Sequence, residues 1–292
     1  MPVFEFDGDI LKKYTGNQAK VTIPAGTRVI GVMAFDDCTG LKELVIPNSV
    51  VEIRNMAIIY CDDLERIAVV GDNFEFYTSG NCLIDVEEKH LVAAGSGSKI
   101  PSDGSVISIG DYVFAGHSDL NRVAIPEGIV RIGESAFCEC DNLVSVDLPS
   151  TVTLVDYRPF IYSENLTCIT VADGNPVYHS AGNCLIETES RTLLAGCLGS
   201  TIPADGTVTA IGNEAFAGCK KLKTIHIPHQ VLAIGRGAFE NCAELACVTI
   251  ENPAATISDD TFAGCGKLTI RAAAGSVAQK QAKAWGIPFA AI

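Results

Sequence analysis

The segment IPEGIVRIGESAFCECDNLVSVDL, residues 125–148, contains the pattern that decides the fold of this chain. Two other segments share its spacing: IPAGTRVIGVMAFDDCTGLKELVI (23–46) and IPHQVLAIGRGAFENCAELACVTI (227–250). Their consensus is IPxxVxxIGxxAFxxCxxLxxVxI, and Pro24 and Pro47 of successive units lie 23 residues apart. With shortened and degenerate copies the chain has about eight units, and self-similarity at this period indicates a repeat solenoid.

Each unit contains two short extended segments and one turn. LxxVxI alternates like a strand with one buried face, and the proline after it ends the strand. VxxIG predicts a second extended segment, in which the glycine permits a tight turn. AFxxC predicts about one helical turn with its Ala, Phe and Cys pointing inward. One unit has too few apolar residues for its own core, so neighbouring units must stack into a parallel sheet.

The motif GNCLI occurs at 80–84 and again at 182–186, inside insertions at 72–99 and 174–201. Pro47 and Pro149, like Cys38 and Cys140, are separated by the same 102 residues, so a block of repeats with its insertion is duplicated. Each insertion has two apolar runs joined by a charged turn, which predicts a β-hairpin. The hairpins either extend the sheet or project from it toward a partner.

The ends predict caps on the solenoid of residues 23–270, because terminal units would otherwise expose their stacking faces. Residues 1–22 form the predicted N-terminal cap. In residues 271–292, Ser276 is placed to start a short helix and Gly286 to end it. Trp285 and Phe289 are then expected to cover the last unit.

Composition excludes several classes of partner. The net charge of −14 and the pI near 4.7 oppose binding to nucleic acid. The chain is 48% hydrophobic, yet no apolar run reaches the ~18 residues of a membrane helix, so no membrane insertion is expected. The first residues have no basic region followed by an apolar one. We therefore expect a cytoplasmic protein, or a bacterial cell-surface protein whose leader was removed.

Most of the twelve cysteines follow the repeat, which favours buried structural thiols over disulfides or metal sites. Cys82 and Cys184 occupy the duplicated hairpin, whereas Cys168 and Cys247 lie at outward strand positions where a thiol could react. The cysteines at the repeat position itself are Cys38, Cys61, Cys140, Cys219, Cys242 and Cys265.

No catalytic or phosphate-binding motif is present, so we expect neither an enzyme nor a cofactor. His226 and His229 have metal-like spacing only on a helix, and here they flank a strand end. Acidic residues recur just after the cysteine position. We expect them to stabilise the turn by bonding nearby backbone groups. Alternatively, residues from adjacent coils together bind Ca²⁺. These residues are Asp62, Asp63, Asp119, Asp141 and Glu164.

The repeated units resemble the BspA-like (Treponema-type) bacterial leucine-rich repeats. The resemblance implies a leucine-rich-repeat superhelix with a parallel β-sheet on its concave side, and with turns and single helical turns on the other. It also implies adhesion or protein recognition, often at a bacterial cell surface. Where an asparagine ladder is expected, the chain has Ser49, Gly128, Thr151 and Gln230. The ladder is therefore predicted to be absent.

The predicted function is non-enzymatic recognition of a protein partner, of unknown identity, through the concave sheet, by a monomer or weak homo-oligomer. Alternatives are a structural or self-associating element, a Ca²⁺-binding adhesion module, or a hydrolase that uses a carboxylate pair. The outward strand residues expected to contact the partner are Glu43, Val45, Arg66, Arg122, Ser145, Asp147, Thr170, Thr224, His226 and Thr249.

Overall fold

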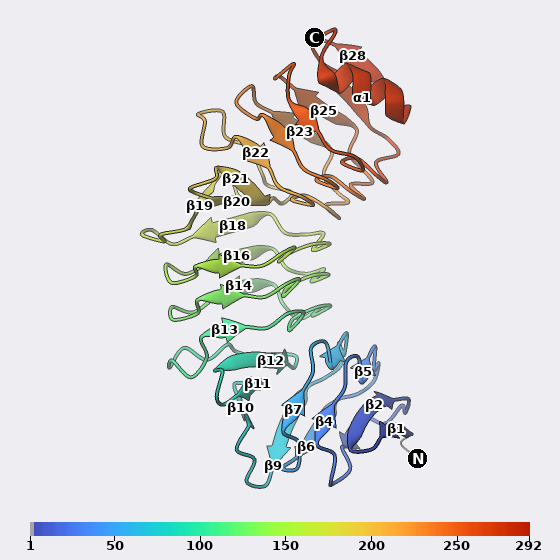
Figure 1. Ribbon diagram of the computed structural model, residues 1–292, viewed down its shortest axis with the longest axis vertical. Helices are drawn as coiled ribbons and strands as arrows, with labels where there is room; N and C mark the ends of the chain where they lie inside the picture. Colours follow the sequence, from blue (N-terminus) through green and yellow to red (C-terminus); the bar gives the residue numbers. More distant parts are fainter. Residues whose placement is uncertain (1–2) are drawn as a thin grey trace. The chain divides into compact units, whose positions relative to one another are not determined.

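The computed structural model describes residues 3–292, and the repeats form a solenoid in which successive coils pair through short parallel strands (Figure 1). The chain divides into two units, which are described separately. Unit 1 comprises residues 1–120, 125–140 and 154–159, and unit 2 comprises residues 121–124, 141–153 and 160–292.

The LxxVxI segments form the predicted strands. In one of them Leu44 and Ile46 are fully buried, while Glu43 faces outward, as alternation along a strand requires. In unit 1 these strands are β3 (Lys20–Thr22), β6 (Glu43–Pro47) and β9 (Arg66–Val70). In unit 2 they form two sheets. One has β14 (Arg122–Ala124), β16 (Ser145–Leu148) and β18 (Cys168–Val171), and the other has β23 (Thr224–Ile227), β25 (Cys247–Ile250) and β27 (Thr269–Ala272), to which the C-terminal strand β28 (Phe289–Ala291) adds.

The VxxIG segments form a second series of two-residue strands. Their glycines do not have positive φ, contrary to the predicted tight turn. A Cβ at Gly31 would lie 2.9 Å from the Leu11 carbonyl oxygen, so glycine permits the close approach of adjacent coils. The strands in unit 1 are β4 (Val29–Ile30), β7 (Glu52–Ile53), β13 (Ser108–Ile109), β15 (Arg131–Ile132) and β17 (Leu154–Val155). Those in unit 2 are β22 (Ala210–Ile211), β24 (Ala233–Ile234) and β26 (Thr256–Ile257).

The AFxxC segments correct the prediction of a helical turn. The Ala-Phe pair lies between two residues with positive φ, such as Met33 (φ 55°) and Asp37 (φ 51°), and Phe35 begins a two-residue strand. This backbone lets the Phe35 N–H donate to the carbonyl of Ala57 in the next coil, at 2.8 Å. A helical turn would use such groups within one coil. Two of the segments pair as strands, β5 (Phe35–Asp36) and β8 (Ile58–Ile59).

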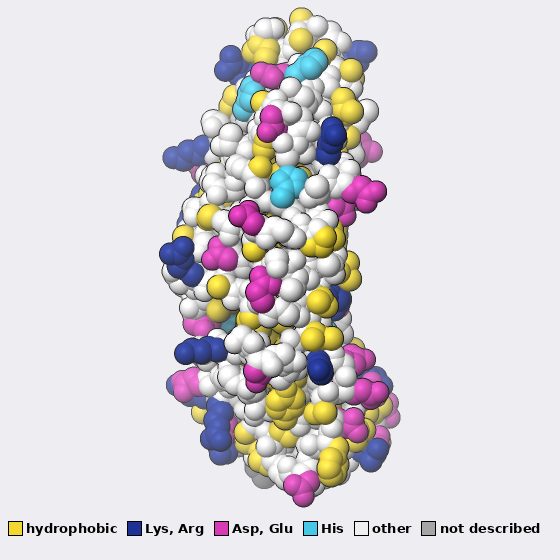
Figure 2. Space-filling model, turned by 90° about the vertical axis from the view of Figure 1, so that its left-hand side faces the viewer, with side chains coloured by type: hydrophobic (Ala, Val, Ile, Leu, Met, Phe, Trp, Pro, Cys, Tyr) yellow, Lys and Arg dark blue, Asp and Glu magenta, His cyan; other side chains and the backbone are white. Residues whose placement is uncertain are grey.

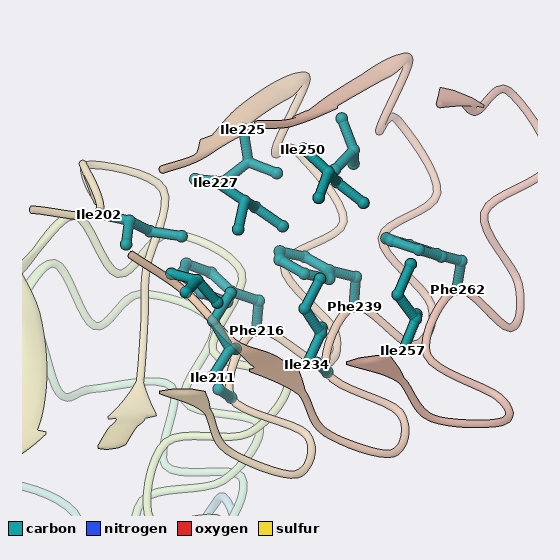
Figure 3. Close-up of a cluster of buried hydrophobic side chains, with 14 of the residues drawn as sticks. Ile202, Ile211, Phe216, Ile225, Ile227, Ile234, Phe239, Ile250, Ile257 and Phe262 are labelled. Atoms are coloured by element: carbon teal, nitrogen blue, oxygen red, sulfur yellow. The ribbon is translucent and has the colours of Figure 1, made fainter. Parts of the chain in front are cut away.

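The phenylalanine rings of successive AFxxC segments stack in the core. In unit 2, the ring centroids of Phe216 and Phe239 are 5.0 Å apart, and those of Phe239 and Phe262 are 5.5 Å apart. Figure 3 shows the three rings in a row above Ile211, Ile234 and Ile257. In unit 1, the rings of Phe114 and Phe137 stack at 4.9 Å. The repeat thus converts one apolar position into a continuous core.

The repeat cysteines have a role that packing alone did not predict. The Sγ–H of Cys242 donates to the carbonyl oxygen of Phe216 in the preceding coil, at 3.2 Å. Cys140 makes the same contact with Phe114 at 3.0 Å. The thiol is therefore both a small buried apolar group and a hydrogen-bond donor between coils. All twelve cysteines are free, as predicted.

The two insertions extend the sheets instead of projecting from them. Each contains the predicted hairpin and one strand that the sequence did not reveal, which makes an antiparallel three-stranded meander. The last strand of each meander pairs in parallel with the next VxxIG strand. The meanders are β10 (Phe76–Ser79), β11 (Cys82–Asp85) and β12 (His90–Ala94) in unit 1, and β19 (Tyr178–Ala181), β20 (Cys184–Glu187) and β21 (Thr192–Ala195) in unit 2.

The prediction that asparagine rungs are absent is wrong. Asn73 Nδ2 donates to the carbonyl of Val50 at 3.0 Å, and Asn175 repeats this contact with Val152 at 2.8 Å. The buried Asn252 makes a third rung with Val231. Asn73 and Asn175 lie at the start of the two insertions and Asn252 precedes the shortened last unit, whereas the prediction considered only the positions of Ser49, Gly128, Thr151 and Gln230.

The chain ends have their own secondary structure. At the start, β1 (Phe4–Asp7) and β2 (Ile10–Tyr14) form a hairpin whose Tyr14 N–H donates to the Ala34 carbonyl at 2.8 Å. Near the end, α1 (Val277–Trp285) begins after Ser276, whose side chain caps it, and stops at Gly286 (φ 68°), as predicted. The boundaries at residues 22 and 270 stay predictions, and residues 1 and 2 of the predicted cap lie outside the described residues. Within residues 3–292, no helix is long and apolar enough to cross a membrane.

Candidate binding surfaces

The outward side of the sheets formed by the LxxVxI strands is here called the strand face. In unit 1, β3, β6 and β9 align Lys20, Glu43 and Arg66 in one row. Glu43 contacts both cations: Lys20 Nζ lies 3.0 Å from Oε2, and Arg66 Nη1 lies 3.5 Å from Oε1. Both cationic side chains are more than half exposed. The row therefore presents positive charge that one carboxylate partly neutralises.

In unit 2, strands β14, β16 and β18 also place polar side chains in rows. Arg122 lies beside Ser145, and Asp147 lies beside Thr170. Arg122 Nε donates to Ser145 Oγ at 3.0 Å, and the Thr170 hydroxyl donates to the Asp147 carboxylate. Each pair is fixed across adjacent strands, while Arg122 and Asp147 remain exposed.

The sheet of β23, β25 and β27 places His226, Thr249 and Arg271 in one row. His226 Nε2 lies 3.1 Å from Glu251 Oε1, and both side chains are about half exposed. The other Glu251 oxygen accepts the backbone N–H of His229 at 3.0 Å. One carboxylate therefore orders the histidine side chain and the turn after its strand. Thr224 is exposed in the neighbouring row.

The ten predicted contact residues are thus divided among three sheets. Two of them are buried: Val45 is 8% exposed and Ser145 is 3% exposed. Val45 lies between Thr22 and Ala68 of the adjacent strands, and Ser145 lies beside Arg122, which hydrogen-bonds to it. Neither offers its side chain to a partner. Figure 2 shows one side of the molecule, where charged and histidine side chains are scattered among uncharged atoms.

Lys20, Arg271 and Glu251 are additional polar residues on or beside the strand face. The sequence prediction missed Lys20 and Arg271 because they precede the first full repeat and belong to the shortened last one. Their strand phase was the available signal: Lys20 is in register with Glu43, and Arg271 with Thr249. Glu251 follows its strand directly, where alternation gives no signal.

Two of the acidic residues after the cysteine position bond to turns, and Glu164 pairs with Lys220. Asp63 Oδ2 accepts the N–H of Gly40 at 2.9 Å, and Asp119 Oδ2 accepts the N–H of Gly97 at 2.6 Å. The hydrogen bond with His117, together with that from Gly97, holds the pKa of Asp119 below its ordinary value despite partial burial. Within residues 3–292, no three His, Cys, Asp or Glu residues gather in a group able to hold an ion.

Unit 1 contains a polar cleft of about 400 Å³ that borders β12 and β13. At this cleft His90 Nδ1 lies 2.8 Å from the Ser108 oxygen. Burial, and secondarily the nearby Arg131 cation, lowers the pKa of His90. Arg131 Nη2 in turn lies 2.9 Å from Asp111 Oδ1 and 2.5 Å from Asp156 Oδ2. A histidine biased toward its neutral form thus lies near an ion-pair network in which one guanidinium contacts two carboxylates.

The duplication shows which parts of this cleft the fold does not require. In the second block, 102 positions later, His90 is replaced by Thr192, Ser108 by Ala210 and Arg131 by Ala233. The second block forms the same strands without these groups. The contact between Ser108 and His90 was missed because they lie in different segments. Among the described residues no carboxylate hydrogen-bonds to the other ring nitrogen, His90 Nε2.

The repeats identify the family. Residues 12–80, 96–189 and 190–282 match the model of the BspA type leucine-rich repeat region, in six copies. The chain therefore belongs to the BspA-type leucine-rich repeat family. No curated protein sequence gives a significant match.

Solved structures with the same fold are bacterial leucine-rich repeat proteins. One, from Eubacterium ventriosum, is 20% identical with a TM-score of 0.53, over 90% of this chain and 71% of that one. A leucine-rich cell surface protein from Faecalibacterium prausnitzii is 24% identical, with a TM-score of 0.51 over 93% and 88%. A protein from Bacteroides ovatus is 22% identical, with a TM-score of 0.50 over 94% and 70%. At these identities the likeness shows the fold alone.

Proposed function

We propose that the chain is a non-enzymatic scaffold that recognises a protein partner through its strand face. The observation that carries the proposal is that this face presents exposed polar side chains for which the core has no use. The row of His226, Thr249 and Arg271 is an example, since the alternate residues Val248 and Ile270 supply the buried contacts. A rigid sheet with regularly spaced polar groups is suited to a protein surface, whose groups can be matched without reordering.

The proposed partner is a protein at a bacterial cell surface. The name of the Faecalibacterium prausnitzii structure places that relative at the cell surface, and the shared fold supports the same location for this chain. The strand face carries both signs of charge, as Glu43 with Arg66 and His226 with Glu251 show. Such a mixture favours a partner surface of mixed charge over a polyanion.

A charge-reversal variant tests the proposal. Arg66, Arg122 and His226 are together replaced by glutamate, and the matched control replaces Arg28, Arg54 and His179, which lie outside the strand face. Both variants change the charge by the same amount. Proteins from bacterial envelope extracts that bind the parent chain are quantified on each variant by mass spectrometry. A specific partner is expected to lose at least tenfold in retention on the strand-face variant only.

Three results would contradict this function. Equal retention on both variants would remove the strand face from recognition. Self-association of the parent chain in light scattering, disrupted by the strand-face variant, would make the face a homo-oligomer interface. Robust turnover in a broad hydrolase screen, abolished by His90→Ala, would make the chain an enzyme.

A further inference from the structure

The last AFxxC turn, residues 261–265, interrupts the hydrogen-bond ladder that joins earlier coils. The N–H of Phe216 donates to Ala238 at 2.8 Å, and that of Gly218 donates to Glu240 at 2.8 Å. One coil later, Phe239 and Asn241 donate in the same way to Thr261 and Ala263. Among residues 3–292 the corresponding N–H groups of Phe262 and Gly264 have no acceptor. Two parallel-strand donors, one residue apart, are therefore unused.

The Phe262 carbonyl is also incompletely bonded. The carbonyls of Phe216 and Phe239 each accept a local N–H and the thiol of the next coil, from Cys242 at 3.2 Å and Cys265 at 3.0 Å. The Phe262 carbonyl accepts only the local N–H of Cys265, at 3.1 Å. An added coil would therefore find two N–H groups without an acceptor and a Phe262 carbonyl that lacks its second hydrogen bond.

A cavity of about 780 Å³ lies next to these groups. Residues 259–266 line one side, and Trp285 and Ile287 line another. The Trp285 ring meets Phe262 edge-on, with centroids 6.4 Å apart and planes at 67°, so the face-to-face ring stack stops there. Asp259 and Asp260 are exposed in the same lining. The cavity therefore combines an apolar wall, unused backbone groups and negative charge.

We propose that an extended segment of a partner protein docks here as an additional rung of the ladder. Two of its carbonyls, at alternate residues, accept the N–H groups of Phe262 and Gly264. An apolar side chain of the segment enters the cavity against Trp285, and a basic residue beside it pairs with Asp259. Main-chain bonds give affinity and the cavity gives specificity, as in other cases of strand addition.

The geometry favours a partner segment over a second copy of the chain joined head to tail. A second copy would have to present the first AFxxC turn, which contains Ala34 and Phe35. The Ala34 carbonyl already accepts the Tyr14 N–H at 2.8 Å. The acceptor that would continue the ladder is therefore occupied, whereas a free peptide has all its carbonyls available.

A peptide titration of the full chain tests the inference. The probe is a synthetic peptide of residues 236–242 (RGAFENC), because Ala238 and Glu240 of this segment are acceptors in the native ladder. Trp285 is the only tryptophan, so its emission reports occupancy of the cavity directly. We expect a saturable emission shift, which a scrambled peptide does not produce.

A blocking variant makes the test specific. A Cβ added at Gly266 meets nothing within 4 Å and requires no positive φ, so Gly266→Phe fills open space without straining the backbone. We expect Gly266→Phe to weaken peptide binding at least tenfold. The control, Leu232→Phe, changes a side chain that is 61% exposed away from the cavity, and binding should be unaltered. Asp259→Lys should weaken binding and reduce its salt dependence.

Several results would overturn the inference. One is the absence of an emission shift at up to about 1 mM peptide, a concentration at which even weakly binding segments bind. The others are equal binding of the scrambled peptide and unchanged peptide binding by Gly266→Phe. A concentration-dependent Trp285 shift without peptide, lost in Gly266→Phe, would assign the cavity to a second copy. The strand-face variant tests a different surface, so the two proposals can fail independently.

Discussion

Replacing Phe239 by alanine should remove the centre of the ring stack in unit 2. Phe239 is fully buried, and its ring lies between those of Phe216 and Phe262, with interplanar angles of 12° and 14°. Truncating a buried phenylalanine costs about 3–5 kcal/mol, and the lost ring pairs put this site at the upper end of that range. The neighbouring coils cannot close the gap, because the backbone ladder fixes their spacing.

The loss can be measured by urea unfolding followed through Trp285, whose ring contacts Phe262 in the next coil. We expect the free energy of unfolding to fall by about 4–5 kcal/mol. Phe74→Ala is the matched control, because this phenylalanine is 82% exposed and its loss should cost less than about 0.5 kcal/mol. A decrease below about 1.5 kcal/mol for Phe239→Ala would refute a core in which each coil depends on its neighbours.

Three further predictions follow from the thiols, the asparagine rungs and the charges. Burial raises the pKa of Cys82 to about 11, so iodoacetamide at pH 8 should modify the half-buried Cys168 and Cys247 before Cys82, and mass spectrometry showing equal labelling of these three cysteines would contradict this. Asn175→Ala should cost about 2–3 kcal/mol in thermal unfolding, because its amide donates to two carbonyls and its oxygen accepts two N–H groups. Because the pKa of Asp119 is lower in the folded state, its stabilisation is present above the unfolded pKa near 4 and is lost as pH falls through the folded value. Asp119→Asn should therefore lose less stability between pH 6 and pH 3 in urea titrations, and equal losses would exclude the effect.

The sequence specified the coil-to-coil contacts well because they are periodic. The 23-residue spacing placed Leu44 and Ile46 inside and identified the cysteines as one buried series. The AFxxC segment was misassigned because its apolar positions fit a helical turn equally well. Residues with positive φ decide the conformation of this segment. Nothing in the sequence indicates that Met33 and Glu214 adopt positive φ. Backbone conformation in a turn depends on the neighbouring coil, which local pattern does not describe.

The strand face was less predictable than the core. Alternation gave the correct side for Glu43 and Arg66, yet it could not reveal that Ser145 is buried beside Arg122. Exposure depends on the length and direction of the neighbouring side chain, 23 residues away, rather than on position alone. The polar cleft was harder still, since Ser108 and His90 come together through a parallel pairing between an insertion and a repeat.

The duplicated block separates structural requirements from additional features within one chain. Asn73 and Asn175, 102 residues apart, make the same rung, so this contact belongs to the fold. The pair Asp111 and Asn213 shows an intermediate case. Both side chains accept the backbone N–H of the next coil at 2.9 Å, yet only Asp111 adds a charge that binds Arg131. Replacement of Asp111 by Asn should therefore preserve the backbone contact while it removes one of the two carboxylates that contact Arg131. A chain that retained its stability after this change would show that the ion pair between Asp111 and Arg131, unlike the rung, is not needed to hold the coils together.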